Sequence, residues 1–274
     1  MMRKCSVCMH GCALKPGQTG LCGARKNQRG EIVSSSYGKI TALALDPIEK
    51  KPLRRFFPGS MILSAGSYGC NLKCPFCQNH NISMCRGFPG AMNMTPGQLV
   101  EKAKELESRG NIGIAFTYNE PLIGFEFVRD TARMAKEKGL KTAVVTNGSV
   151  TARTAEEILP CIDAMNIDLK GFSPKFYEKL GGDLPTVQAF IRMAAERCHV
   201  ELTTLIIPGE NDSPREMELL SGWVASVDPK IPLHVTRFFP QWKMADKKPT
   251  PVETVKSLAA EAGKRLETVF VGNC

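Results

Sequence analysis

Long hydrophobic runs are missing from this sequence: none approaches the ~20 apolar residues that a helix needs to cross a bilayer. The first ten residues, MMRKCSVCMH, also lack the apolar core of a signal peptide. We therefore expect a cytoplasmic protein without membrane contact. Repeats of solenoid period and low-complexity tracts are absent too, which excludes a repeat architecture.

Aromatic residues are scarce, at 7% of the chain, and they do not alternate with basic residues in any stripe. Such a stripe is what binds single-stranded nucleic acid. The formal net charge is nevertheless +9. Four thiolates on Zn²⁺ contribute about −2 and three on a 2+ iron–sulfur cluster about −1, which leaves roughly +6. An acidic electron-donor or substrate protein suits this charge as well as RNA does.

Cysteine, by contrast, is abundant, with 11 in 274 residues. An odd number of cysteines in a reducing compartment favours metal ligation or redox chemistry over a disulfide framework. Seven of them fall in two tight clusters. For the other four we expect small, buried, apolar side chains: Cys85, Cys161, Cys198 and Cys274.

From about residue 61, apolar runs alternate with amphipathic helical segments, a pattern typical of a parallel α/β sheet. The expected strands are 61–66, 112–118, 142–148, 164–170, 200–209 and 233–239, with a last strand at 268–273. Six strand–helix units are too few for a closed eight-unit barrel. We therefore predict an α/β fold with a partial (βα)6 TIM-like barrel, with a doubly wound sheet as the alternative. Residues 1–60 are expected to form a cysteine-rich metal-binding segment and connector, and residues 61–274 the barrel.

Hydroxyl residues followed by proline predict where three helices begin. Thr95 in TPGQ, Ser213 in SPRE and Thr250 in TPVE each precede a proline and stand three residues before Gln or Glu. This spacing is a capping box with proline at the first helical position. If the fold is a barrel, its chemistry belongs at the carboxyl ends of the strands between these helices.

The first cysteine cluster lies in GCNLKCPFCQNHNIS, directly after the strand at 61–66, and holds Cys70, Cys74 and Cys77. A cubane [4Fe–4S] cluster has four irons, so three thiolates leave one iron open to a small molecule. The other interpretation is a zinc knuckle that takes a distant fourth ligand.

The pattern C-x3-C-x-aromatic-C after the first barrel strand resembles the signature of the radical S-adenosylmethionine (SAM) family. The resemblance implies that Cys70, Cys74 and Cys77 bind a [4Fe–4S] cluster and that SAM chelates its open iron. Reduction then yields a 5′-deoxyadenosyl radical that abstracts hydrogen from a substrate, while the protein positions and shields the reaction. In TYNEP, Tyr118 and Asn119 stand where the family has the glycines of its GGEP motif.

The same resemblance implies SAM contacts at successive strand ends. They are Phe76, Asn79, Tyr118, Asn119, Glu120, Thr146, Asn147, Asp168, Lys170, Thr203, Leu205 and His234. Arg237 is expected to contact the substrate.

CQN, DLK and the IIPG run are similar to the activases of glycyl radical enzymes, typified by pyruvate formate-lyase activating enzyme. CSVCMHGCALKPGQTGLCGARKNQRG, YGKITALALDPIEKKPL and RFFP resemble the AmmeMemoRadiSam system radical SAM family. These resemblances imply flavodoxin or ferredoxin as electron donor. They also imply a glycyl radical enzyme, or Memo-like and Ammecr-like proteins, as partners.

The second cluster, Cys5, Cys8, Cys12 and Cys22, has the spacing C-x2-C-x3-C-x9-C. Four thiolates with one tight pair fit a closed zinc or rubredoxin-like site, although a second iron–sulfur cluster or no metal is also possible. We expect His10 to be a bystander. The alternative function for the whole chain is a basic zinc-ribbon protein that binds nucleic acid, which the scarcity of aromatic residues disfavours.

Overall fold

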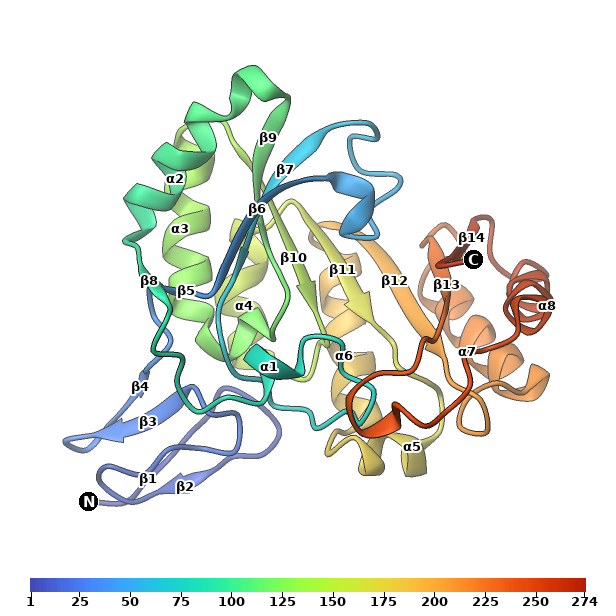
Figure 1. Cartoon of the computed structure of the whole chain (residues 1–274), viewed down its shortest axis with the longest axis horizontal. Coiled ribbons are helices and arrows are strands. Elements are labelled where there is room, and N and C mark those ends of the chain that lie inside the picture. Colours follow the sequence, from blue (N-terminus) through green and yellow to red (C-terminus); the bar gives the residue numbers. More distant parts are fainter.

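The strands expected from the sequence form one sheet in the computed structural model, which describes residues 1–274 (Figure 1). The spatial order is β14-β13-β12-β11-β10-β9-β7-β6. Neighbours from β7 to β14 are parallel, and β6 pairs antiparallel with β7. The strands are β6 (Ala42–Pro47), β7 (Met61–Gly66), β9 (Asn111–Phe116), β10 (Lys141–Thr146), β11 (Ala164–Asp168), β12 (His199–Ile206), β13 (Leu233–Arg237) and β14 (Val269–Gly272).

This order decides between the two predicted architectures. A doubly wound sheet reverses its strand order at a switch point, whereas here the parallel strands follow one another in chain order throughout. The two outer strands, β6 and β14, do not pair with each other, so the barrel is open. The prediction of a partial α/β barrel is therefore confirmed.

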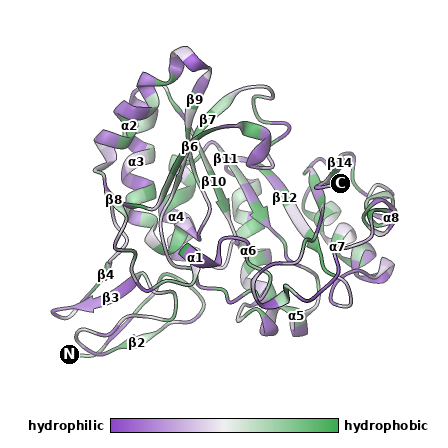
Figure 2. Cartoon of the chain, in the orientation of Figure 1, coloured by the Kyte–Doolittle hydropathy of each residue, from purple (hydrophilic) through white to green (hydrophobic).

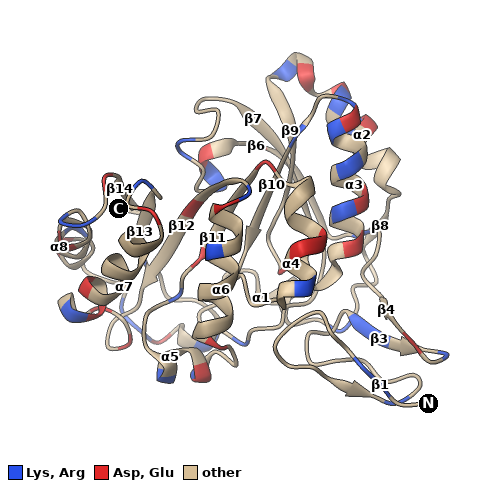
Figure 3. Ribbon diagram, turned by 180° about the vertical axis from the view of Figure 1, so that it is seen from behind, with Lys and Arg blue, Asp and Glu red and all other residues tan.

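Helices cover the outer face of the sheet. They are α2 (Pro96–Glu105), α3 (Phe125–Glu137), α4 (Ala152–Ile158), α6 (Leu184–Ala195), α7 (Pro214–Val227) and α8 (Val252–Ala262). Between helices and sheet lies a core of 44 buried residues, seen in Figure 2 as hydrophobic strands with helices that are hydrophobic on one side. Figure 3 shows that the helices carry both basic and acidic residues. Exposed ion pairs such as Lys102–Glu105 on α2 indicate that these outer helix faces are in contact with solvent.

The connector before β7 packs against the amino-terminal part of the sheet. Ile48, Leu53 and Phe56 form a small apolar cluster with alanines of β9, β10 and β11. Ile48 belongs to the single turn η1 (Ile48–Lys50). The connector therefore lies at the end of the sheet opposite to the strands' carboxyl ends.

The segment before the connector is built from short strands, β1 (Arg3–Lys4), β2 (Ala13–Leu14), β3 (Arg25–Gln28), β4 (Glu31–Ser34) and β5 (Lys39–Ile40). β5 pairs with β8 (Met92–Asn93). The division of the chain at residue 60 stays a prediction, and β6, which precedes it, is an edge strand of the main sheet. No helix is both long and apolar enough to cross a membrane.

Two of the three predicted helix starts are confirmed. Thr95 forms the full capping box with Gln98. The Ser213 hydroxyl accepts a hydrogen bond from the backbone N–H of Glu216, but the predicted box is not completed there, because the Glu216 carboxylate accepts the Phe172 N–H. The prediction for Thr250 is wrong: Pro251 stands at the N-cap position of α8 without a side-chain capping bond, and the buried Thr250 hydroxyl donates to the Ile206 carbonyl at 2.6 Å. Thr250 therefore ties the loop after β13 to the end of β12.

Of the four scattered cysteines, Cys161 is buried as expected, and Cys85 and Cys198 are half-buried. Cys274 is exposed, so the expectation of a buried side chain is wrong there. It lies beyond β14, where no helix covers the chain.

Candidate active site at the carboxyl ends of the strands

The cysteine loop begins three residues after the end of β7, at a glycine that the backbone requires. Gly69 has φ +89°, and a Cβ there would lie 2.5 Å from the carbonyl oxygen of Cys22. The next residue, Cys70, donates its N–H to that same carbonyl at 3.1 Å. The N-terminal segment therefore contacts the cysteine loop at its first cysteine, which any larger residue at position 69 would prevent.

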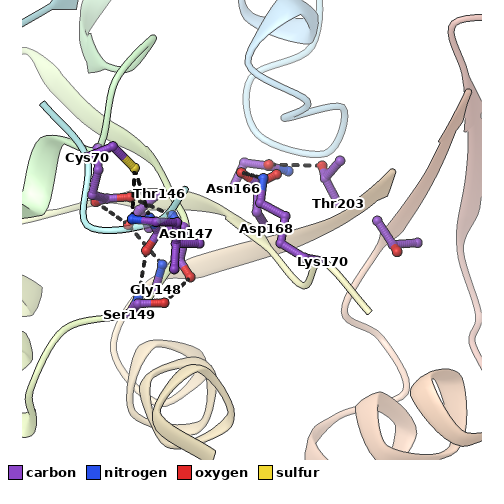
Figure 4. A network of polar contacts seen from close by, with 12 residues as sticks. Cys70, Thr146, Asn147, Gly148, Ser149, Asn166, Asp168, Lys170 and Thr203 are labelled. Carbon is purple, nitrogen blue, oxygen red and sulfur yellow. Dashed lines mark hydrogen bonds and ion pairs between the residues drawn. The ribbon is translucent and has the colours of Figure 1, made fainter. Parts of the chain in front are cut away.

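The thiols of Cys70 and Cys74 lie in surroundings that disfavour a free thiolate. Burial raises the pKa of the Cys74 thiol to about 11 and that of Cys70 well above its ordinary value. Two N–H groups nevertheless point at the Cys70 sulfur, from the Leu72 backbone at 3.4 Å and from the Asn147 amide at 3.6 Å. Figure 4 shows Asn147 beside Cys70. Buried thiols with amide donors suit thiolates that are neutralised by bound iron.

An apolar shell surrounds this loop. Leu72, Cys74 and Phe76 are buried in a cluster that also contains Phe176 and Phe238. No three His, Cys, Asp or Glu side chains in the chain are grouped closely enough to hold a single metal ion. A cubane cluster takes one thiolate at each iron, so its ligands lie farther apart than those of a single ion, and three separated thiols on one loop suit such a cluster.

Glu120 is the buried carboxylate of the site. It is 2% exposed and accepts hydrogen bonds from the Leu122 N–H, the Thr146 hydroxyl and the Asn147 N–H, at 3.0, 2.7 and 2.7 Å. Burial raises its pKa to about 7, although these three bonds favour the charged form. The network joins the end of β9 to the turn after β10, and Asn147 extends it to Cys70.

Tyr118 and Asn119, which stand at the glycine positions of the GGEP motif, make hydrogen bonds to neighbouring segments. The Asn119 amide donates to the carbonyls of Tyr68 and Gly69, which fixes the start of the cysteine loop. Tyr118 has φ +74°, and its hydroxyl donates to Asp46 of β6 at 2.8 Å. Its ring occupies space that a Cβ on Gly66 would need, 2.8 Å from that position.

The next two strand ends carry paired polar groups. Lys170 and Asp168 form an ion pair at 2.6 Å, and Thr203 donates to Asn166 at 2.9 Å (Figure 4). Burial lowers the pKa of Lys170, but Asp168 and the thiol groups of Cys74 and Cys77 outweigh it and raise the pKa overall. Lys170 is therefore a cation held close to the cysteine loop.

The remaining expected site residues differ in their surroundings. Phe76 is buried and stacks on Phe176, whereas Asn79 is exposed immediately before α1 (His80–Ser83). Leu205 is half-buried against the apolar shell of the cysteine loop. Arg237 donates from Nε to the Thr250 carbonyl at 2.7 Å, so this guanidinium holds the loop after β13.

His234 does not join the other expected SAM contacts in these hydrogen-bonding networks. Its Nε2 lies 2.6 Å from Glu201, which also pairs with His199 at 3.0 Å and accepts the N–H groups of Arg54 and Arg55. Glu201 is 0% exposed. The assembly joins the connector to the first halves of β12 and β13. Burial alone raises the pKa of Glu201, but its hydrogen bonds with His199, His234 and the two N–H groups lower it to about 2.

We expect Glu201→Gln to destabilise the protein by about 3 kcal/mol at neutral pH, because it breaks a buried charged network. A carboxyl whose pKa falls from 4.5 to about 2 on folding contributes stability that is complete above pH 4.5 and lost as pH falls towards 2. The difference in Tm between wild type and variant should therefore stay constant from pH 6 to about pH 4.5 and narrow as the pH falls from there towards 2. Exposed Glu253→Gln is the control, and an unchanged gap would contradict the assignment.

The four N-terminal cysteines lie near one another on two tight turns. Cys8 and Cys22 are buried, and the pKa of each thiol is raised by burial and by the neighbouring cysteines, for Cys8 to about 11. Gly11 and Gly23 adopt positive φ and close the turns through bonds to the carbonyls of Cys8 and Gly20. Like those of the cysteine loop, these side chains are not grouped closely enough in this structure to form a single-ion site. Four thiols are nevertheless a donor set of the kind that zinc or iron takes, so a metal here stays a prediction.

The sequence did not indicate which residues connect the N-terminal segment, the cysteine loop and the turn after β10. Asn71 donates to the Ser149 carbonyl at 2.8 Å and accepts from the Asn147 amide at 3.0 Å. His10, expected to be a bystander, bonds the Asn71 carbonyl through Nε2 at 2.8 Å. Asn71 follows the first cysteine directly, but no pattern in one sequence pairs it with residues 10 and 147.

An open α/β barrel with a three-cysteine loop after its first parallel strand defines the class of protein: a barrel enzyme of iron–sulfur chemistry. The sequence model of the Radical SAM superfamily matches residues 65–220. An uncharacterized protein from Methanocaldococcus jannaschii is 37% identical over 98% of this chain and 81% of its own length. The chain therefore belongs to the radical SAM superfamily, whose members use a [4Fe–4S] cluster and SAM.

More distant relatives include two activases. The chain is 26% identical to pyruvate formate-lyase-activating enzyme of Clostridium pasteurianum over 58% of this chain and 67% of that one. It is 24% identical to the Escherichia coli K12 pyruvate formate-lyase 1-activating enzyme, over 53% of this chain and 60% of that one.

Solved structures agree with the fold. Streptococcus suis SuiB bound to S-adenosylmethionine has a TM-score of 0.60 at 15% identity, over 76% of this chain and 48% of that one. QueE from Escherichia coli has a TM-score of 0.53 at 14% identity, over 86% and 93%.

Proposed function

We propose that Cys70, Cys74 and Cys77 hold a [4Fe–4S] cluster on which the chain cleaves SAM reductively. The observation that supports this most is the loop itself: three cysteines at the carboxyl end of β7, with N–H donors aimed at Cys70. When bound, the cluster and SAM supply a 5′-deoxyadenosyl radical, which abstracts hydrogen from a protein, peptide or small-molecule carbon. The family relationship favours this activity over a nucleic-acid-binding zinc ribbon.

The protein groups have distinct roles in this proposal. Glu120 binds the SAM amino group, because it is a buried carboxylate joined through Asn147 to the first cysteine. Lys170 and Asp168 bind polar groups of SAM beyond the next strands. Thr203 and Leu205 line the same end of the sheet. The apolar shell around Phe76 excludes water, which a primary carbon radical requires.

Binding of SAM to the open iron can be tested without turnover. We expect anaerobically reconstituted protein, reduced with dithionite, to give a [4Fe–4S]⁺ signal by electron paramagnetic resonance. Addition of SAM should shift its g values, because SAM becomes a ligand of one iron. A reduced cluster whose spectrum does not respond to SAM would contradict the proposal.

For the substrate, we propose a glycine of a glycyl radical enzyme or a target in the AmmeMemoRadiSam system. The activase relatives support the first and the motifs of the N-terminal segment the second. A glycyl radical is delocalised, so hydrogen transfer to a primary alkyl radical is downhill. Deuterium should pass from labelled candidate protein into 5′-deoxyadenosine. Flavodoxin or ferredoxin is the proposed electron donor.

We propose that the N-terminal cysteines bind zinc or another metal, and that this metal holds the segment against the cysteine loop. In Cys12→Ser we expect the zinc content to fall from about one per chain to near zero. Cluster iron should be lost faster in chelator, since Cys22 and His10 bond the loop at Cys70 and Asn71. Cys198→Ser, outside both clusters, should change neither. Unchanged zinc in the first variant would contradict the assignment.

A further inference from the structure

The loop after β13 crosses to the cysteine loop and lies against it. In Figure 1 the orange-red turn η5 (Trp242–Met244) lies beside the teal segment around α1. The backbone N–H of Lys243 donates to the Pro75 carbonyl at 3.1 Å, between the second and third cysteines. Met244 is buried in the apolar shell with Cys74 and Phe76. This loop is therefore the outer cover of the cysteine loop.

A stacked aromatic pair, Trp242 and His80, connects this loop to the backbone of the third cysteine, Cys77. The Trp242 ring stacks on His80 with centroids 5.3 Å apart and planes at 9°. His80 Nδ1 in turn lies 3.2 Å from the Cys77 carbonyl oxygen. Trp242 adopts φ +51°, a conformation that a bulky residue takes only where its surroundings hold it. Both rings are half-buried, so the contact reaches from the surface to Cys77.

The same cover is basic. Lys243 is exposed and its ammonium lies 4.6 Å from the centre of the Trp242 ring. Lys247 and Lys248 are also exposed, and the only acidic residue of the loop between residues 238 and 250 is Asp246. Lys73, within the cysteine loop, adds a further exposed cation. A partner with an acidic contact surface would be steered to this face.

We propose that this face, formed by His80, Trp242, Lys243 and Lys247, docks an acidic one-electron donor protein that reduces the cluster. The inference rests on the proposed cluster and deepens it by naming where the electron enters. Glu120, Asp168 and Lys170 occupy the side of the site that is proposed for SAM. The loop after β13 is a second approach to the cluster loop, and it joins surface rings to a cysteine backbone.

The test compares two reductants in the same assay, formation of 5′-deoxyadenosine from SAM. Reduced flavodoxin must dock, whereas dithionite diffuses to the cluster directly. In Lys243→Glu we expect the KM for flavodoxin to rise about tenfold at low salt, because a charge reversal at a docking surface mainly slows association. The rate with dithionite should not change, since the backbone bond to Pro75 remains. Salt should lower the flavodoxin-driven rate of wild type.

Matched variants separate charge from folding. Lys256→Glu makes the same charge change on α8, where Lys256 is exposed, and should leave both rates unchanged. Trp242→Phe keeps a ring against His80 and should retain flavodoxin-driven turnover that Trp242→Ala loses. An unchanged flavodoxin KM in Lys243→Glu, or an equal loss with dithionite, would overturn the docking site. Wild type that is inactive with dithionite would instead overturn the proposed function on which the docking site rests.

Discussion

Replacing Cys74 with serine should remove both the cluster and SAM cleavage. Cys74 is 8% exposed and lies within the apolar shell, so a hydroxyl there is surrounded by apolar side chains and is a poor ligand for iron. We expect iron to fall from about four to less than about one per chain after reconstitution. Formation of 5′-deoxyadenosine should become undetectable. Iron analysis and chromatographic assay of the nucleoside measure both effects.

The control for Cys74→Ser is Cys85→Ser. Cys85 is half-buried, eight residues beyond Cys77, and donates to the Asn81 carbonyl, a bond that a serine hydroxyl can also make. This variant should keep full iron and full activity. If it instead loses the cluster, the assignment of the three ligands is wrong.

Glu120→Gln should weaken SAM binding about 10- to 100-fold, which corresponds to about 1.4 to 2.8 kcal/mol. The substitution removes the negative charge that pairs with the SAM amino group. It also places an amide NH₂ opposite one of three donors that the carboxylate satisfies, so at least one bond is lost. Equilibrium dialysis of labelled SAM with reconstituted protein measures the affinity.

Glu157→Gln is the matched control, because Glu157 pairs with Arg129 at the surface of α4 rather than with a strand end. Its SAM affinity should equal that of wild type. Glu120→Gln with retained iron and unchanged SAM affinity would show that Glu120 only joins β9 to β10.

The fold was predictable because each buried parallel strand is visible in the sequence as a continuous apolar run. The runs at 61–66, 142–148 and 164–170 begin within a residue of β7, β10 and β11, and Thr95 and Ser213 begin helices as their spacing indicates. The prediction for Thr250 failed because its hydroxyl bonds the Ile206 carbonyl at the end of β12 instead of capping the helix that follows it. The spacing of residues in a sequence predicts hydrogen bonds between near neighbours, but it does not predict hydrogen bonds between distant segments.

The site was predictable to the same extent. Polar residues follow each predicted strand, so Glu120, Asn147 and Cys70 could be named as site residues. The hydrogen bonds that connect these three residues could not be predicted. His234 sits near an end of its strand in the sequence, yet the opposite end from the one that carries the other residues. The contact of His80 with Trp242 joins residues 162 positions apart (242 − 80 = 162) and has no local signature.

The central claim is that this chain cleaves SAM through a cluster on Cys70, Cys74 and Cys77. The most direct measurement is anaerobic incubation of reconstituted wild type with SAM and dithionite. We expect 5′-deoxyadenosine and methionine to form in equal amounts, with none from Cys74→Ser prepared in parallel. Intact SAM in the presence of a reduced [4Fe–4S] cluster would contradict the account.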